Sequence, residues 1–230
     1  AVESPRPVMA ALAFLTVGIS LKLALFPLHV WLPGAYAHAP SVATAFLAGT
    51  ATKVAIYVLL RLFFSVFGVA ISFETLPVSE MMLVLSVAAM FIASLMAVFE
   101  ENTKRMLAYS SLAQVGYITL GISLANQAGL TGSIVHLFNH ALLKTGMFLA
   151  LGAIAYRVGT TRLSDLAGIG RTMPWTMAAF VVGGLALIGV PGTSGFVSKW
   201  YLAVGASDIR RTRVSLAGLT AQSLRESMQA

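Results

Sequence analysis

The chain has 230 residues, of which 58% are hydrophobic and 10% are charged, and its mean hydropathy is +0.86. A soluble domain carries about 25% charged residues, so this composition predicts an integral membrane protein. The chain has no cysteine, which excludes disulfides and thiolate or iron–sulfur sites. Its net charge of +7 comes mostly from loops and the carboxyl end, a pattern of membrane topology rather than of nucleic-acid binding.

Six apolar stretches are long enough to cross a bilayer, which takes about 20 residues. They lie at 8–32, 40–67, 79–99, 103–125, 130–156 and 174–204. Turn-forming residues separate them at Pro33-Gly34, at 68–77, at 126–129 and at 157–174. Backbone groups in lipid must find partners inside the protein, and no alternating barrel pattern is present. We therefore predict an all-α bundle of about six transmembrane helices.

The first and last stretches carry a proline near the middle of the membrane. Pro27 interrupts the first, and Pro191 lies in a Gly-Val-Pro-Gly run of the sixth. Proline removes a backbone donor and clashes with the preceding turn, so we predict two discontinuous helices. Each proline could also be a simple kink. The two stretches are five helices apart and therefore run in opposite directions, which is typical of an inverted repeat with a transport site.

Four lysines lie inside apolar stretches, one in each of four predicted helices. They are Lys22, Lys53, Lys144 and Lys199. An ammonium at the bilayer centre costs roughly 2.5–3.5 kcal/mol on insertion scales, so such residues face a bundle interior and take part in moving charge. No carboxylate lies at membrane depth to pair with Lys22, because the eight acids all fall in loops, helix ends or the tail. We expect its partner to come from outside this chain.

Two helix faces carry polar stripes. Lys53, Tyr57 and Arg61 are spaced four apart, although Arg61 also fits a position at the membrane surface. His136, His140 and Lys144 form the second stripe, with Asn139 beside it.

A histidine pair could bind a metal, but a catalytic zinc site needs three protein ligands and no third one is suitably spaced. A proton relay suits the pair better, since histidine titrates near neutrality. We therefore expect no metal and no cofactor.

The balance of Lys and Arg between the two ends of the spans predicts an orientation. One end holds Lys104, Arg105, Arg157, Arg162 and Arg171, whereas the other holds Arg6 and Arg61. The positive-inside rule makes the first end cytoplasmic. The polar tail at 206–230 places four arginines at the opposite end, which contradicts this count. We predict a translocation domain at 1–205 and a tail at 206–230 that is either a basic interfacial helix or a non-native, disordered end.

Six segments of the chain, in order, resemble a known family. They are Lys22–Pro33, Ala39-Pro40, Thr52–Arg61, Lys104–Gly116, His136–Lys144 and Gly189–Lys199. The chain resembles the antiporter-like proton-translocating subunits shared by respiratory complex I, an NADH:quinone oxidoreductase, and the Mrp-type cation/proton antiporters. The match covers about residues 8–205, and Thr52-Lys53-Val and Lys144-Thr145 resemble the Mrp D-type subunit more closely.

The resemblance implies a role for each residue of a buried relay. Lys22 would be the lysine of the first broken helix, which pairs with a glutamate upstream of Ala1. Lys53 would be the connecting lysine, and His136 and His140 would form the central polar axis, with Lys144 as a further member of the proton relay. Lys199 would be the exit residue. The chain would then be the middle-to-late half of a longer member.

The resemblance also implies partners and a location. It favours a subunit of a multi-subunit monovalent cation/proton antiporter, moving protons with Na⁺ or K⁺ as further candidate ions. The alternatives are a membrane subunit of an NADH:quinone oxidoreductase or a related hydrogenase, and a non-conducting structural subunit. The partners would be lipid and other membrane subunits, in a bacterial-type inner membrane that the chain crosses several times. Enzymatic activity would belong to the whole assembly, since we find no catalytic centre here.

Overall fold

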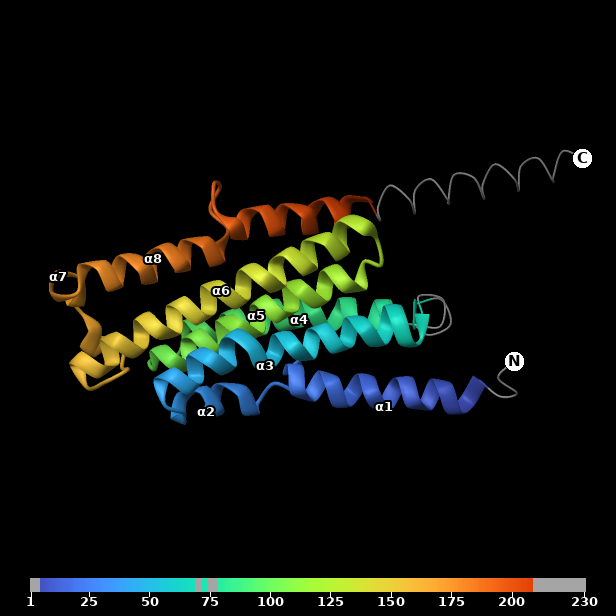
Figure 1. Cartoon of the computed structure of the whole chain (residues 1–230), viewed down its shortest axis with the longest axis horizontal. Helices are drawn as coiled ribbons and strands as arrows, with labels where there is room; N and C mark the ends of the chain where they lie inside the picture. The colour runs from blue at the N-terminus through green and yellow to red at the C-terminus, as the bar shows by residue number, and fades with distance from the viewer. Residues whose placement is uncertain (1–4, 69–71, 74–77, 209–230) are drawn as a thin grey trace, which may run out of the picture.

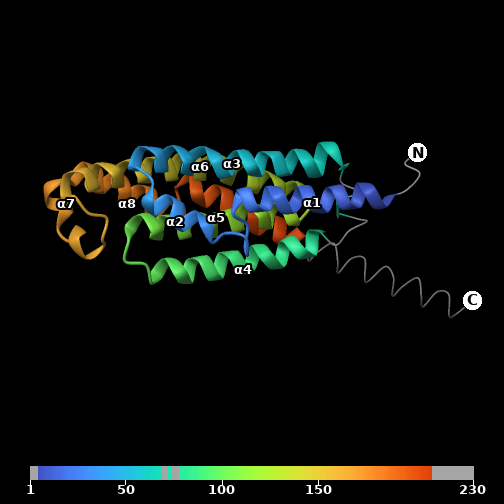
Figure 2. The same ribbon diagram turned by 90° about the horizontal axis from the view of Figure 1, so that it is seen from below.

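The computed structural model describes residues 5–68, 72–73 and 78–208, and every regular element in that part of the chain is helical. The helices are α1 (Pro5–Leu23), α2 (Trp31–His38), α3 (Ser41–Arg61), α4 (Val78–Val98), α5 (Thr103–Ser123), α6 (Gln127–Val158), α7 (Ile169–Thr172) and α8 (Pro174–Ile188). Residues 194–208 are also helical. A π-helical turn (Leu62–Val66) extends α3, and a 3₁₀ turn (Ser164–Leu166) precedes α7. The long helices lie side by side in an elongated bundle (Figures 1 and 2).

Four of the described helices are long and apolar enough to cross a membrane. They are α1 from Arg6, α3 with its π-helical turn, α4 and α6. Helix α5 is as long as α4 but more polar, and 15 of its 21 residues are buried, against four in α4. It therefore occupies the centre of the bundle. The sixth predicted span consists of two shorter helices, α8 and 194–208.

Helix α5 is fixed in the centre by small and hydroxyl side chains. A Cβ atom on Gly116 would lie 2.9 Å from the Ser86 carbonyl oxygen, so only glycine permits the close approach of α4. The Ser86 and Thr119 hydroxyls are 2.7 Å apart across the same contact. At the start of α5, the Asn102 side chain accepts hydrogen bonds from two backbone amides and caps the helix.

Apolar packing forms two clusters along the bundle. One cluster joins α2, α3, α5 and α6 around Tyr36 and Phe148, whose rings meet edge to face at 5.6 Å. The other joins α1, α3 and α5 around Leu23, Ile56 and Ile118. The surroundings of any polar side chain inside the bundle are therefore mostly apolar, and an unpaired polar group there is costly.

Both predicted discontinuous helices are present. The first break covers residues 24–30, between α1 and α2, and the second break covers 189–193, between α8 and 194–208. Helices α1 and α8 lie on opposite sides of the bundle and run in opposite directions (Figure 1). This arrangement agrees with the predicted inverted repeat.

Details of the first break differ from the sequence-based expectation. Helix α1 already ends at Leu23, four residues before Pro27. The turn predicted at Pro33-Gly34 is wrong, because both residues lie within α2 and the chain turns at Ala39-Pro40 instead. Pro33 is tolerated there because it lies in the first turn of the helix, where its missing N–H has no helical partner to lose.

Parts of two other predictions lie outside the described residues. The predicted connection at 68–77 is described only at residues 68, 72 and 73. Only residues 206–208 of the predicted tail are described, and they continue the helix that begins at 194. The four arginines of the tail lie outside the described residues.

Candidate functional site

A set of six polar side chains from three helices, here called the polar row, lies in the interior of the bundle. It consists of Lys53 from α3, His136, His140 and Lys144 from α6, and Ser198 and Lys199 from 194–208. Five of them are at most 7% exposed, and Lys199 is half-buried. Polar groups this deep in an apolar bundle need specific partners.

Lys144 connects α6 to α5 through two hydrogen bonds. Its ammonium nitrogen donates to the Leu107 carbonyl oxygen at 2.8 Å and to the Ser110 hydroxyl at 2.9 Å. The side chain has no exposed surface. Both hydrogen-bond partners of Lys144 among the described residues are neutral oxygens, which leave its charge uncompensated when it is protonated.

His136 is held through both ring nitrogens. Nε2 lies 2.8 Å from Gln114 Oε1 on α5, and Nδ1 lies 2.8 Å from the Ser198 hydroxyl oxygen. Its ring stacks on that of His140, with centroids 6.2 Å apart and an interplanar angle of 12°. His136 therefore joins α5, α6 and the helix that follows the second break.

His140 has no hydrogen-bond partner among the described residues at either ring nitrogen, although the ring is buried. Lys144 lies four residues further along α6, one helical turn away. Lys53 itself donates to the Ala48 carbonyl oxygen of its own helix. A buried ring with two unpaired nitrogens costs stability and contributes none through hydrogen bonds, so it is a candidate for a functional rather than a structural side chain.

Lys199 lies at the second break. Its ammonium nitrogen donates to the carbonyl oxygens of Leu187 at 2.9 Å and Ile188 at 3.0 Å, the last two residues of α8. It also lies 4.5 Å from the centre of the Tyr117 ring, within range of a cation–π interaction. Tyr117 is in turn 6.0 Å from His136, measured between ring centres. The row therefore extends from α6 to the break in the sixth span.

The structure brings together five of the six residues predicted for the site. Lys22 is the exception: its side chain is exposed on α1 and has no hydrogen bond or ion pair to any other described residue.

The predicted stripe on the second helix was partly wrong. Tyr57 and Arg61 are exposed, whereas Lys53 is buried. The same four-residue spacing on α6 keeps His136, His140 and Lys144 buried, so spacing alone does not decide which members of a stripe face the interior.

Three contributors were not singled out as site residues from the sequence: Gln114, Tyr117 and Ser198. Gln114 and Tyr117 are three residues apart on α5 and so share a face toward α6. A glutamine near the middle of the least apolar predicted helix is the sequence feature that could have identified Gln114. Ser198 is adjacent to Lys199, but serine is too common in helices to stand out.

Acidic side chains lie away from the row. Those in the described part of the chain are Glu80, Glu100, Glu101, Asp165 and Asp208, all in loops or near helix ends. Glu100 pairs with Arg105 at 2.9 Å. No group of three or more His, Asp or Glu side chains among the described residues could hold a metal ion.

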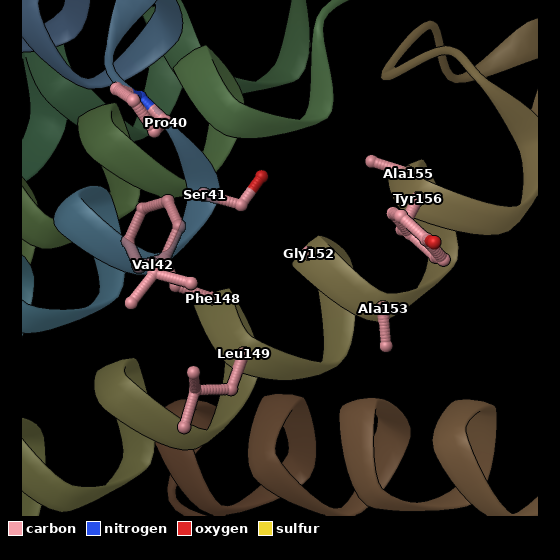
Figure 3. Close-up of a pocket in the computed structure, with 9 residues that line it drawn as sticks. All are labelled: Pro40, Ser41, Val42, Phe148, Leu149, Gly152, Ala153, Ala155 and Tyr156. Carbon is pink, nitrogen blue, oxygen red and sulfur yellow. The ribbon is translucent and has the colours of Figure 1, made fainter.

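The bundle also has a surface cavity of about 550 Å³ between the start of α3 and the second half of α6 (Figure 3). Ser41 and Val42 line it on one side, and Phe148, Gly152 and Tyr156 line it on the other. The Ser41 hydroxyl points into this space in Figure 3. No member of the polar row lines this cavity. Because the buried titratable side chains gather in the row and not at the cavity, we place the candidate site in the row.

Comparison with known proteins gives matches over most of the chain. The family model described as "NADH:quinone oxidoreductase/Mrp antiporter, TM" matches residues 3–224. The NADH-quinone oxidoreductase subunit N of Desulforudis audaxviator is 45% identical over 201 residues, which cover 86% of this chain and 39% of that protein. The D-type subunit of the Na(+)/H(+) antiporter of Alkalihalophilus pseudofirmus is 35% identical over 196 residues, which cover 85% of this chain and 39% of that protein. The chain thus spans about two fifths of the length of these relatives.

A solved structure has the same fold. A chain of the Mrp complex from Dietzia sp. DQ12-45-1b superposes with a TM-score of 0.82 at 36% identity. The superposition covers 88% of this chain and 37% of that one.

Proposed function

The chain belongs to the NADH:quinone oxidoreductase/Mrp antiporter transmembrane family, and on that basis we propose that its polar row carries protons through the membrane. The observation that carries the proposal is the set of buried, titratable side chains that connects α3, α5 and α6 with the second break. Lys53, Lys144 and Lys199 would take up and release protons as neighbouring charges move. His136 and His140 would pass them along, since an imidazole can bind a proton at either nitrogen.

The physical basis is that the row contains several groups that can carry positive charge and no acidic side chain among the described residues. Like charges repel strongly at short range in a medium of low dielectric constant. His136, His140 and Lys144 follow one another at four-residue intervals on α6, so a proton gained by one group would repel a proton on the next. A proton entering at one position would therefore favour release at the next. A membrane potential adds about 2.3 kcal/mol per charge per 100 mV.

We further propose that the row works inside a larger assembly. The relatives are named as subunits of quinone oxidoreductases and antiporters, which supports other membrane subunits as partners. The motifs at Lys53 and Lys144 favour a cation/proton antiporter. The higher identity to a subunit named NADH-quinone oxidoreductase subunit N favours a redox-driven pump. Na⁺-dependent flux without a quinone substrate would indicate the antiporter.

The decisive experiment compares two buried lysines that both donate to a carbonyl oxygen. Lys144 lies in the row, whereas Lys104 is 8% exposed and donates to the Ala39 carbonyl oxygen at 2.9 Å, outside the row. The test uses the unmutated protein in its native membrane assembly, here called the intact parent protein. We expect Lys144→Met to lower its proton flux about 100-fold or more, which is the usual loss of rate when a proton-transferring side chain is removed. Flux is measured in inverted membrane vesicles with a pH-sensitive dye.

Lys104→Met is the matched control. It removes a buried ammonium of the same kind, so we expect it to reduce the amount of assembled protein but not the flux per assembled complex. Equal flux in Lys144→Met and the parent protein would contradict the proposed path.

A further inference from the structure

The buried Ser198 hydroxyl has two acceptors within reach. Its oxygen lies 2.8 Å from His136 Nδ1 and 3.0 Å from the Gly195 carbonyl oxygen. The serine has no exposed surface, so water from outside does not satisfy it. A hydroxyl carries one hydrogen and can donate to only one acceptor at a time.

The protonation state of His136 decides which acceptor the hydroxyl uses. Nε2 faces the Gln114 Oε1 acceptor at 2.8 Å, so Nε2 carries a hydrogen. In the neutral ring, Nδ1 then has no hydrogen and accepts one from Ser198. In the charged ring both nitrogens are donors, so Nδ1 donates to the Ser198 oxygen. The serine hydrogen must then go to the Gly195 carbonyl oxygen.

We propose that Ser198 is a hydrogen-bond switch for His136: its hydroxyl hydrogen turns from Nδ1 to the Gly195 carbonyl oxygen when His136 takes up a proton, and turns back on release. The inference rests on the proposed proton-translocating function. Uptake breaks one N–H bond of a lysine ammonium or one O–H bond of a hydronium ion and forms one N–H bond at Nδ1, and release transfers that proton to a neutral lysine amine or a water molecule. The serine O–H bond only rotates. Both states leave Nδ1 and the Ser198 oxygen hydrogen-bonded, so a proton can pass without a buried unpaired group at either atom.

No other described side chain replaces this partner. The titratable groups around His136 are His140 on the same helix, Tyr117 on α5, Lys53 on α3 and Lys199 on 194–208. None of them hydrogen-bonds either ring nitrogen of His136 among the described residues. The switch also connects the row to the second break, because Ser198 lies just beyond it.

The test uses Ser198→Ala and Ser198→Thr in the intact parent protein labelled with ¹⁵N-histidine. Ser198→Ala removes the hydroxyl, so we expect proton flux to fall about tenfold or more, the effect of losing a hydrogen bond to a charged group. The Nδ1 resonance of neutral His136 should move downfield, toward that of an imine nitrogen without a donor. The Nε2 resonance should stay in place. Ser198→Thr keeps a hydroxyl and should restore both flux and resonance.

Two further variants make the result decisive. Ser86→Ala removes another buried hydroxyl, which is hydrogen-bonded to the Thr119 hydroxyl and to no member of the row, and should leave both readouts unchanged. His136→Gln assigns the resonance and tests the path itself. If His136→Gln abolishes flux but Ser198→Ala leaves flux or the Nδ1 resonance unchanged, the switch is refuted and the path stands. If His136→Gln conducts normally, the proposed function fails.

Discussion

The two breaks of the bundle are built on the same backbone turn. At the first break, Ala24 adopts a left-handed conformation, its N–H donates to Leu21, and Leu25 donates to Ser20. At the second break, Gly189 takes the left-handed position, with equivalent bonds from its own N–H to Ala186 and from Val190 to Leu185. This is the usual way for a helix to end within a protein.

The two breaks differ in what becomes of their lysines. Lys22 precedes the first break and is exposed on α1, whereas Lys199 follows the second break and folds back onto the end of α8. The helix at 194–208 packs closely on α6, because a Cβ atom on Gly132 would lie 2.9 Å from the Leu202 backbone nitrogen. A broken helix alone therefore does not make a site. The site arises where the second half of the broken helix returns its lysine to the bundle.

Removing each lysine tests this comparison most strongly. If both breaks serve one path, Lys22→Ala and Lys199→Ala in the intact parent protein should each lower proton flux about 100-fold, with normal assembly. The flux is measured in vesicles and normalised to assembled protein. Unchanged flux in Lys22→Ala alone would show that the exposed lysine of the first break has no part in transport.

Substitutions of two glycines test whether the helix at 194–208 packs more closely on the bundle than α1 does. Gly132→Ala places a methyl group against the Leu202 backbone, so we expect a loss of about 1–3 kcal/mol in the free energy of unfolding. Gly18→Ala on α1 is the control, since a Cβ atom there meets no other atom within 4 Å. It should leave stability unchanged or raise it by up to about 1 kcal/mol. Thermal unfolding in detergent measures both, and equal effects would contradict the difference between the two regions.

The smallest expected effect concerns the tryptophan near each break. The Trp31 indole N–H donates to the Leu21 carbonyl oxygen at 3.0 Å and so connects α2 to the end of α1. Trp31→Phe should therefore cost about 1 kcal/mol. Trp200 stacks on Phe196 and makes no hydrogen bond among the described residues, so Trp200→Phe should cost less. A larger loss of melting temperature in Trp200→Phe would contradict the role given to Trp31.

Much of the fold could be predicted from the sequence, because length and apolarity define membrane helices directly. The two proline-containing breaks and the burial of Lys53 and Lys144 were predictable for the same reason. The end of α1 at Leu23 was not, because a left-handed alanine carries no sequence signal comparable to glycine. Ser198 and Gln114 could not be assigned either. Their importance depends on how closely α5 and 194–208 approach α6, which no local pattern encodes. The roles of the row residues and the membrane orientation stay predictions.

The position of Lys199 on the last carbonyl groups of α8 has a consequence for charge balance. Aligned peptide dipoles leave about half a negative charge at the carboxyl end of a helix. At the second break, this partial negative charge lies next to the Lys199 ammonium and partly balances its charge. The row has no acidic side chain among the described residues that could do the same. A carboxylate loses its charge when it is protonated, but a peptide carbonyl keeps its dipole across the physiological pH range. The ammonium at this position therefore keeps a stabilising partial negative charge beside it, whatever the pH on either side of the membrane.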